Sequence, residues 1–242
     1  MNHLVVDAGN TRFKIAVFSG EELIRKESLG ILSITILEDL IAACNPVSSI
    51  ISSVIHLDNE IVRFLKLLPN VILLDENTPV PVTNNYKTPH TLGRDRLANA
   101  VAASMLFPGS DVLIVDAGTC LKFDFIDAKA VYYGGAISPG LRMRYESLHH
   151  YTDRLPLLAP ADVAELTGNT TETSMHSGIL NGMLAEINGI EEQYRKRYDK
   201  LQLILTGGDF RYFLNHIKKP IFADPELTLK GLHFILLHNH LK

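Results

Sequence analysis

Apolar and polar positions alternate along the first thirty residues of the chain and predict three strands. The apolar runs cover 4–6, 13–18 and 23–29, and short segments containing Gly9 and Gly20 separate them. Alternation with a period of two, interrupted by glycine, is typical of half-buried strands joined by tight turns. We therefore expect the chain to begin with an antiparallel meander of three strands.

The pattern then changes to helices and strands in alternation. Apolar residues recur at helical spacing over 36–41 and 61–68, whereas 49–54 and 71–74 are short apolar runs typical of buried strands. The next segment, 78–91, is rich in Pro, Asn, Thr and Tyr and is predicted to be an irregular loop. A loop of this length is usually functional or mobile.

The same order of elements returns in the second half of the chain. An Ala-rich helix is predicted over 96–107 and ends at Pro108-Gly109. After it the predicted strands are 112–115, 121–126, 131–137, 201–205 and 221–223, and the predicted helices begin near 141, 171 and 227. Because each half consists of three strands followed by alternating elements, we expect two domains, 1–109 and 110–242.

One short motif stands at the end of the first strand of each half. It reads Val-Val-Asp-Ala-Gly-Asn-Thr over 5–11 and Ile-Val-Asp-Ala-Gly-Thr over 114–119. An Asp at a strand end can hold a hydrated cation, while the backbone N–H groups of the following glycine turn face phosphate oxygens. A single copy also fits a plain tight hairpin, but two copies in matching contexts indicate a duplicated phosphate-binding turn.

The two copies match further when one residue is skipped. Thr11 then aligns with Thr119, and Lys14 aligns with Lys122. Asn10, Thr11 and Lys14 supply an amide, a hydroxyl and a cation, which suit the β- and γ-phosphates of a nucleotide. We expect the two hairpins to face each other across a cleft and to bracket a nucleoside triphosphate.

A second candidate site is Gly93-Arg94-Asp95-Arg96, where the polar loop meets the Ala-rich helix. An Asp between two arginines stays ionised, so Asp95 could deprotonate an alcohol while an arginine pairs with an anionic group. The same carboxylate also fits a helix cap, and the cluster also fits a surface ion-pair network. The sequence leaves these alternatives open.

Two glycine-rich segments complete the candidate chemistry. The segment 134–140 holds three glycines, which favours close backbone approach to a ligand or to the facing hairpin. The segment 206–209, Thr-Gly-Gly-Asp, follows a buried strand, where a nucleotide base or ribose often lies. A plain strand-to-helix turn explains it equally well. Cys120 has no basic partner in the sequence and is expected to be a packed thiol.

Composition excludes several classes of function. The chain has 242 residues, 46% hydrophobic and 21% charged, with a formal net charge of −4 and no Lys/Arg cluster, so nucleic-acid binding is not expected. No run approaches the roughly 20 apolar residues of a membrane span, and Asp7 interrupts the first apolar run too early for a signal peptide. Two cysteines without paired spacing fit a cytoplasmic protein.

Together these motifs resemble type III pantothenate kinases, members of the superfamily that includes acetate kinase, sugar kinases and actin. The resemblance covers nearly the whole chain and rests on both phosphate turns, on Tyr86 with Gly93-Arg94-Asp95-Arg96, on the segment 134–141, and on Thr171 with 174–178. It implies an α/β fold of two duplicated actin-like, ribonuclease H-like domains. Each would hold a mixed five-stranded sheet with flanking helices, and a cleft would lie between them.

The resemblance also implies an activity and roles for residues. The activity is transfer of the ATP γ-phosphate to pantothenate, the first step towards coenzyme A, with Asp95 as the base. The residues implied for ATP are Asp7, Ala8, Gly9, Asn10, Thr11, Arg12, Phe13, Lys14 and Thr119. Those implied for pantothenate are Tyr86, Gly93, Arg94, Asp95, Arg96 and Thr171. Asp116 would bind a monovalent cation, potassium or ammonium, and Mg²⁺ would accompany ATP near Asp7. The family is usually dimeric, so Thr171 is expected at the dimer interface.

The chain departs from the family pattern at one place. After Thr119 the family often has Ala-x-Thr, whereas this chain has Cys120-Leu121-Lys122, which brings a positive charge near the implied cation site. Two other functions fit the same fold: a catalytically silent, nucleotide-binding regulatory relative, and a kinase or phosphohydrolase of the superfamily acting on another small alcohol, a sugar or an acyl phosphate. An intact Asp95 together with both turns argues against the silent relative.

Overall fold

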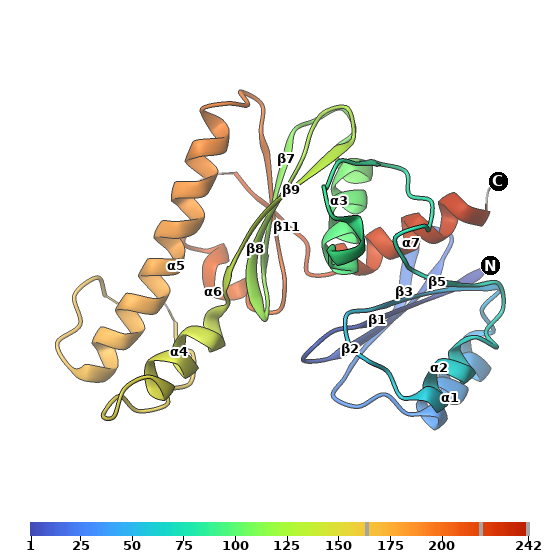
Figure 1. Ribbon diagram of the computed structural model, residues 1–242, viewed down its shortest axis with the longest axis horizontal. Coiled ribbons are helices and arrows are strands. Elements are labelled where there is room, and N and C mark those ends of the chain that lie inside the picture. Colours follow the sequence, from blue (N-terminus) through green and yellow to red (C-terminus); the bar gives the residue numbers. More distant parts are fainter. Residues whose placement is uncertain (163–164, 218–219, 241–242) are drawn as a thin grey trace. The chain divides into compact units, whose positions relative to one another are not determined.

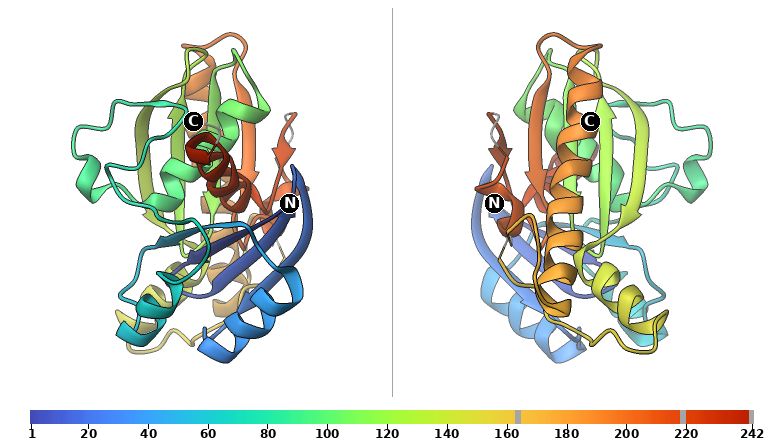
Figure 2. Two further views of the ribbon diagram at one scale, coloured as in Figure 1. Left: turned by 90° about the vertical axis from the view of Figure 1, so that its right-hand side faces the viewer. Right: turned by 90° about the vertical axis from the view of Figure 1, so that its left-hand side faces the viewer.

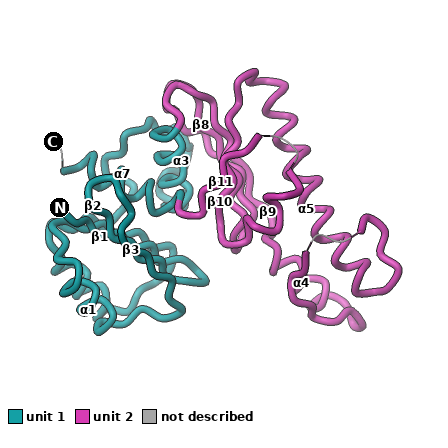
Figure 3. The backbone as a smooth tube through the Cα atoms, turned by 180° about the vertical axis from the view of Figure 1, so that it is seen from behind, with its two compact units in different colours: residues 1–106, 227–242 teal, residues 107–226 magenta. Residues whose placement is uncertain are grey.

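The computed structural model describes residues 1–162, 165–217 and 220–240 and divides into two compact units. Unit 1 consists of residues 1–106 together with the segment that begins at 227, and unit 2 consists of residues 107–226 (Figure 3). Within the described ranges, no helix is long and apolar enough to cross a membrane.

Unit 1 is built on a mixed sheet of five strands. They are β1 (Asn2–Ala8), β2 (Phe13–Ser19), β3 (Glu22–Leu29), β4 (Ser48–Ser53) and β5 (Val71–Leu73). The order across the sheet is β3-β2-β1-β4-β5, with the first three strands antiparallel and with β4 and β5 added in parallel. Figure 1 labels β1, β2, β3 and β5 of this sheet. The predicted opening meander is confirmed.

Helices cover both faces of this sheet. The helices of unit 1 are α1 (Ile34–Cys44), α2 (Asn59–Leu65), α3 (Arg94–Leu106) and α7 (Leu227–His240), and the 3₁₀ turn η1 (Pro89–Thr91) and the short strand β6 (Thr83–Asn84) lie in the predicted loop. Leu4 and Val6 of β1 pack with Leu37 of α1 and Leu65 of α2 on one face. Because side chains alternate along a strand, Asp7 lies on the other face, which α7 covers.

Unit 2 repeats the topology of unit 1. Its strands are β7 (Val112–Ala117), β8 (Cys120–Ile126), β9 (Val131–Pro139), β10 (Gln202–Thr206) and β11 (Phe222–Ala223), in the order β11-β10-β7-β8-β9. Strands β7, β8 and β9 are antiparallel, whereas β10 and β11 add in parallel beside β7. Each strand has a counterpart in unit 1, which confirms the predicted duplication.

The helices of unit 2 are α4 (Leu141–His150), α5 (Thr171–Arg195) and α6 (Arg211–Leu214). The long helix α5 lies along one face of the sheet (Figure 2). Its residues Leu180, Met183 and Ile187 share a core with Leu113 and Val115 of β7. Asp116, which alternates with those two strand residues, therefore lies on the face turned away from α5.

Helix α7 belongs by packing to unit 1 although it ends the chain. Gly231 of α7 lies so close to α3 that an added Cβ would come within 1.8 Å of the Ala98 carbonyl oxygen. The Thr228 hydroxyl also donates a hydrogen bond of 2.8 Å to Asn99 of α3. A division at residue 109 assigns α7 by sequence position to the second half, whereas its contacts are with the first.

Candidate active site

The first phosphate turn joins β1 to β2 in unit 1. Asp7 is buried and lies opposite Lys14 in the strand register. The Gly9 N–H donates to the Arg12 carbonyl at 3.1 Å and closes the turn. Residues 10–12 are exposed, as expected for a turn that meets a ligand.

Ser52 lies beside Asp7 and is not among the predicted site residues. Strand β4 runs parallel to β1, and its register places Ser52 next to Asp7 on the same face of the sheet. Ser52 is fully buried, and its hydroxyl has no hydrogen-bond partner among the described residues. The Ser-Ser-Ile-Ile-Ser-Ser run of β4 was the available signal, because serine is unusual in a buried central strand.

The segment Gly93–Arg96 begins α3 and gathers four of the predicted substrate residues. The Arg96 N–H donates to Asp95 Oδ1 at 2.9 Å, so this carboxylate does contribute to the start of the helix. A Cβ at position 93 would come within 2.6 Å of the same oxygen, which explains the glycine. The guanidinium carbon of Arg96 lies 5.6 Å from the centroid of the Tyr86 ring, a cation–π contact.

Arg94 points to a different partner. Its guanidinium forms a salt bridge of 2.7 Å with Glu76 and donates to the Pro89 carbonyl at 3.2 Å. These bonds fasten the predicted loop to the beginning of α3. Glu76 was not among the predicted site residues, and no motif marks it.

The second phosphate turn joins β7 to β8 in unit 2 and differs from the first in length. The Gly118 N–H donates to the Cys120 carbonyl at 3.1 Å, so this turn is one residue shorter than the Gly9 turn. The register pairs Asp116 with Lys122, as it pairs Asp7 with Lys14 in unit 1. The alignment that skips one residue is therefore the structural one. Lys122 Nζ forms a salt bridge of 2.7 Å with Asp116 Oδ2.

Both glycine-rich segments lie against this second turn. A Cβ at Gly140 would come within 2.4 Å of the Gly118 carbonyl oxygen, and one at Gly207 within 2.3 Å of the Ala117 carbonyl oxygen. Gly207 also has a φ of +96°, and the Asp209 N–H donates to the Ala117 carbonyl at 2.8 Å. Glycines of 134–140 thus lie against the backbone of the hairpin in their own unit, and close approach to a ligand stays a prediction. Burial raises the pKa of Asp209, and nearby Arg142 opposes this shift.

Thr171 is the first residue of α5 and lines an open groove of about 760 Å³ in unit 2. The preceding Thr170 forms a reciprocal capping box with Thr173, which fixes the start of the helix. One turn further on, His176 Nδ1 lies 2.6 Å from the Tyr145 hydroxyl. The groove is also lined by Asn169, Thr170, Ser174, Leu148 and Leu155.

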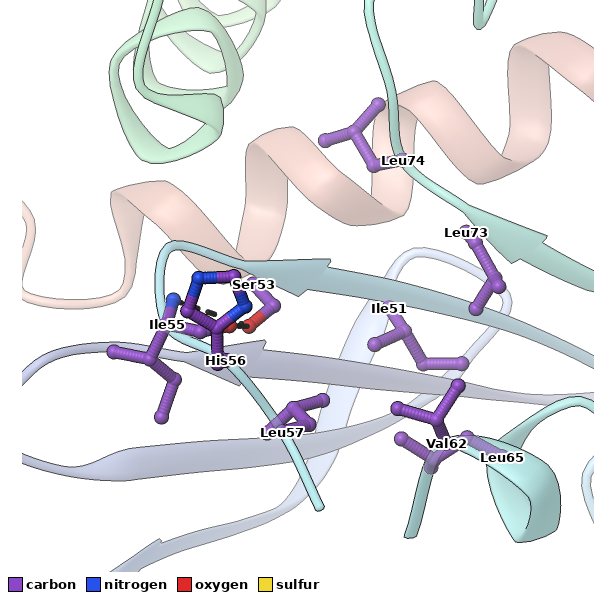
Figure 4. A pocket seen from close by; sticks show the side chains of 9 residues that line it. All are labelled: Ile51, Ser53, Ile55, His56, Leu57, Val62, Leu65, Leu73 and Leu74. Carbon is purple, nitrogen blue, oxygen red and sulfur yellow. Dashed lines mark hydrogen bonds between the residues drawn. The ribbon is translucent and has the colours of Figure 1, made fainter. Parts of the chain in front are cut away.

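A smaller pocket of about 270 Å³ in unit 1 has a different character (Figure 4). Its lining is mostly aliphatic and comes from β4, β5, α2 and the segment after β4, where Ser53 hydrogen-bonds the Ile55 backbone. It contains none of the residues predicted to bind phosphate or substrate, so it is not part of the candidate site. No group of three or more His, Cys, Asp or Glu side chains suited to a metal ion occurs within the described ranges.

Comparison with known proteins decides the family. The family model for type III pantothenate kinase matches residues 3–193. The chain belongs to the type III pantothenate kinase family. It is 46% identical over 238 residues to the type III pantothenate kinase of Phocaeicola vulgatus and 41% identical over 237 residues to that of Cytophaga hutchinsonii. The alignments cover 98% of this chain in both cases, and 98% and 99% of the two relatives.

Solved structures support the fold of this pantothenate kinase family member. A Campylobacter jejuni protein named for the Baf family has a TM-score of 0.63 at 20% identity, covering 99% of this chain and all of that one. A glucokinase of Streptomyces griseus, solved with glucose and AMPPNP, has a TM-score of 0.53 at 11% identity, covering 98% of this chain and all of that one. The predicted actin-like, two-domain fold of the sugar-kinase type is thus confirmed.

Proposed function

We propose that this chain transfers the γ-phosphoryl group of ATP to the primary hydroxyl of pantothenate and forms 4′-phosphopantothenate. The observation that carries the proposal is the Asp95 carboxylate at the start of α3 in a chain of this family. Gly93 lies against it, and the buried Arg96 is held over Tyr86. A proton acceptor beside a fixed guanidinium is what phosphorylation of an anionic alcohol requires.

On the acceptor side, Asp95 takes the proton of the pantothenate hydroxyl. The hydroxyl oxygen then bonds to the γ-phosphorus, the bond from that phosphorus to the bridging oxygen breaks, and ADP leaves with the electron pair. Arg96 supplies fixed positive charge for an anionic group, because it is buried and stacked before any ligand arrives. The residues proposed to contact pantothenate are Tyr86, Gly93, Arg94, Arg96 and Thr171.

On the donor side, the turn between β1 and β2 is proposed to hold the phosphates of ATP from Asp7 to Lys14, with Thr119 contributing from the second turn. Exposed backbone N–H groups and hydroxyls suit phosphate oxygens. Mg²⁺ fits beside Asp7, because a carboxylate next to the buried hydroxyl of Ser52 offers oxygen ligands. The ion would neutralise charge on the phosphates.

The proposal also covers the cellular compartment and the oligomeric state of the protein. Both cysteines are free thiols, which supports a reducing cytoplasm. The large apolar side chains of Tyr151 and Leu166 are more than four-fifths exposed in unit 2. As the family resemblance implies, we propose a homodimer in which Thr171 borders the partner, with these exposed apolar side chains at the interface.

The test is a coupled assay of ADP release with ATP, Mg²⁺ and pantothenate. The unmodified chain is expected to release ADP only when pantothenate is present. Asp95→Asn keeps the size of the side chain but removes the base, so kcat should fall about 10²- to 10⁴-fold. Asp39→Asn, at an exposed position of α1, is the matched control and should leave kcat unchanged.

Three results would contradict the proposal. An Asp95→Asn variant with unaltered kcat would remove Asp95 from the role of base. A chain that binds ATP but releases no ADP with pantothenate would favour the regulatory alternative, and ADP release with a different small alcohol would favour another substrate.

A further inference from the structure

Lys122 and Asp116 form an ion pair that the hairpin itself imposes. They are directly opposite each other on the antiparallel strands β7 and β8. Their side chains are 15% and 10% exposed, and Lys122 Nζ lies 2.7 Å from Asp116 Oδ2. Opposite residues on paired strands have Cβ atoms about 5 Å apart, so the strand register keeps the two side chains within reach of each other.

The second oxygen of this carboxylate faces the protein backbone. A Cβ at Gly207 would come within 2.5 Å of Asp116 Oδ1, and one at Gly118 within 3.3 Å. The carboxylate is thus bordered by an ammonium at one oxygen and by two glycines at the other. Gly207 has no side chain that would block this approach, and its positive φ brings its backbone into the turn.

A free monovalent cation does not fit this arrangement. Family resemblance assigns potassium or ammonium to Asp116, but the lysine ammonium already lies at hydrogen-bond distance from that carboxylate. A second cation at the same carboxylate would meet the repulsion of a tethered like charge with little solvent to screen it. The ammonium ion and the lysine head group also carry the same charge and the same kind of N–H donor.

We propose that Lys122 takes the place of the free monovalent cation, so that this chain needs neither potassium nor ammonium for phosphoryl transfer. The proposal rests on the kinase activity proposed above. Lys122 acts in it as a positioning residue that keeps Asp116 and the Thr119 turn in place and supplies fixed positive charge. The opposition of Asp7 and Lys14 in the first hairpin shows that this lysine position belongs to the duplicated unit.

The test compares cations at constant ionic strength. ADP release by the unmodified chain is measured in the chlorides of choline, sodium, potassium and ammonium, and the four rates are expected to agree within about twofold. Lys122→Thr restores the residue common in the family. Its rate in choline should fall at least about tenfold, and potassium or ammonium should recover most of it. Lys129→Thr, which removes an exposed lysine of the turn after β8, is the matched control and should stay independent of the cation.

Thermal unfolding gives a second measurement that needs no activity. Potassium should raise the Tm of Lys122→Thr above its value in choline, and it should leave the Tm of the unmodified chain unchanged. An unmodified chain that is activated tenfold by potassium would overturn the proposal. So would a Lys122→Thr variant that is equally active in all four salts, or one that is folded and inactive in all of them. If the unmodified chain releases no ADP at all, the kinase proposal fails, and the Tm comparison still decides the role of Lys122.

Discussion

His233 is a buried titratable residue of unit 1. Its ring stacks on Phe18 with centroids 4.1 Å apart, it is 2% exposed, and its Nε2 has no hydrogen-bond partner among the described residues. Burial lowers the pKa of His233 to about 4, and the neighbouring His3 adds a smaller contribution in the same direction. A ring in this position is neutral in the folded protein at neutral pH.

This burial predicts acid sensitivity of unit 1. Between pH 6.5 and about 4 the unfolded chain binds a proton at His233 and the folded chain does not, so stability decreases as the pH falls. The resulting loss in the free energy of unfolding amounts to up to about 3 kcal/mol. Urea unfolding at several pH values should show it, and His233→Phe, which keeps an aromatic ring on Phe18, should reduce the slope. Substitution of the exposed His90 by Asn should leave the dependence of stability on pH unchanged. If His233→Phe has the same dependence as the unmodified chain, His233 is not the source of the acid sensitivity.

The ion pair between Lys122 and Asp116 opposes the binding of a second cation at Asp116. Two like charges 4 Å apart repel by about 4 kcal/mol at an effective dielectric constant of 20. A potassium ion added beside Lys122 would face a penalty of that order. The departure of residues 120–122 from the family pattern was visible in the sequence, but the salt bridge was not, because it depends on the register of β7 and β8.

At the element scale, the sequence predicted the hairpins better than it predicted the partners of their residues. Alternation and glycine predicted both meanders, and the helix 96–107 and the helix from 171 are confirmed as α3 and α5. The contact between Tyr86 and Arg96 was not predictable from pattern, since the loop that carries Tyr86 has no periodicity. Ser52 was not predicted as a site residue, because it is placed there by its pairing with Asp7 on the parallel strand β1, 45 positions away in sequence.

The packing of α3 on α7 predicts a sharp effect of glycine substitution. Gly231→Ala places a Cβ within 1.8 Å of the Ala98 carbonyl oxygen, so the two helices must move apart. Overpacking of this kind costs about 1–3 kcal/mol, which the gain in helix propensity only partly offsets. Urea unfolding should report the loss. Gly189→Ala in α5, where a Cβ meets nothing within 4 Å, is the matched control and should be neutral or stabilising. Equal stability of both variants would contradict the close approach.

At the scale of the whole molecule, the chain leaves unit 1 at residue 106 and returns to it at 227. A division at residue 109 places this last helix in the second half by its position in the sequence, and its composition does not correct that assignment. The buried residues of α7 include the apolar Leu227, Leu229, Leu232, Ile235 and Leu236 and also the polar Thr228 and His233. Because polar and apolar residues are mixed among the buried positions, α7 has no clear polar face to indicate which sheet it covers.

Because unit 1 includes α7 from the end of the chain, we expect removal of α7 to unfold unit 1 and to leave unit 2 folded. A chain ending at residue 226 loses the five apolar side chains of α7 named above, each worth about 1.5–3 kcal/mol of burial, and the sum is comparable with the 5–15 kcal/mol that stabilises a typical domain. Unit 2 is continuous from 107 to 226 and keeps its own core. Amide hydrogen exchange should therefore show loss of protection in β1 to β5 and in α3, with protection retained in β7 to β10 and in α5.

Addition of a peptide of residues 227–240 separates loss of packing from a general defect of the shortened chain. The peptide supplies Gly231 and Thr228, which contact Ala98 and Asn99, so protection of unit 1 should return as the peptide concentration increases. A peptide with Gly231→Val should restore far less protection, because the Cβ position against the Ala98 carbonyl would be filled by a branched side chain. Retained protection of β1 to β5 in the truncated chain without any peptide would show that unit 1 folds without α7. The close packing of α3 on α7 would then contribute little to its stability.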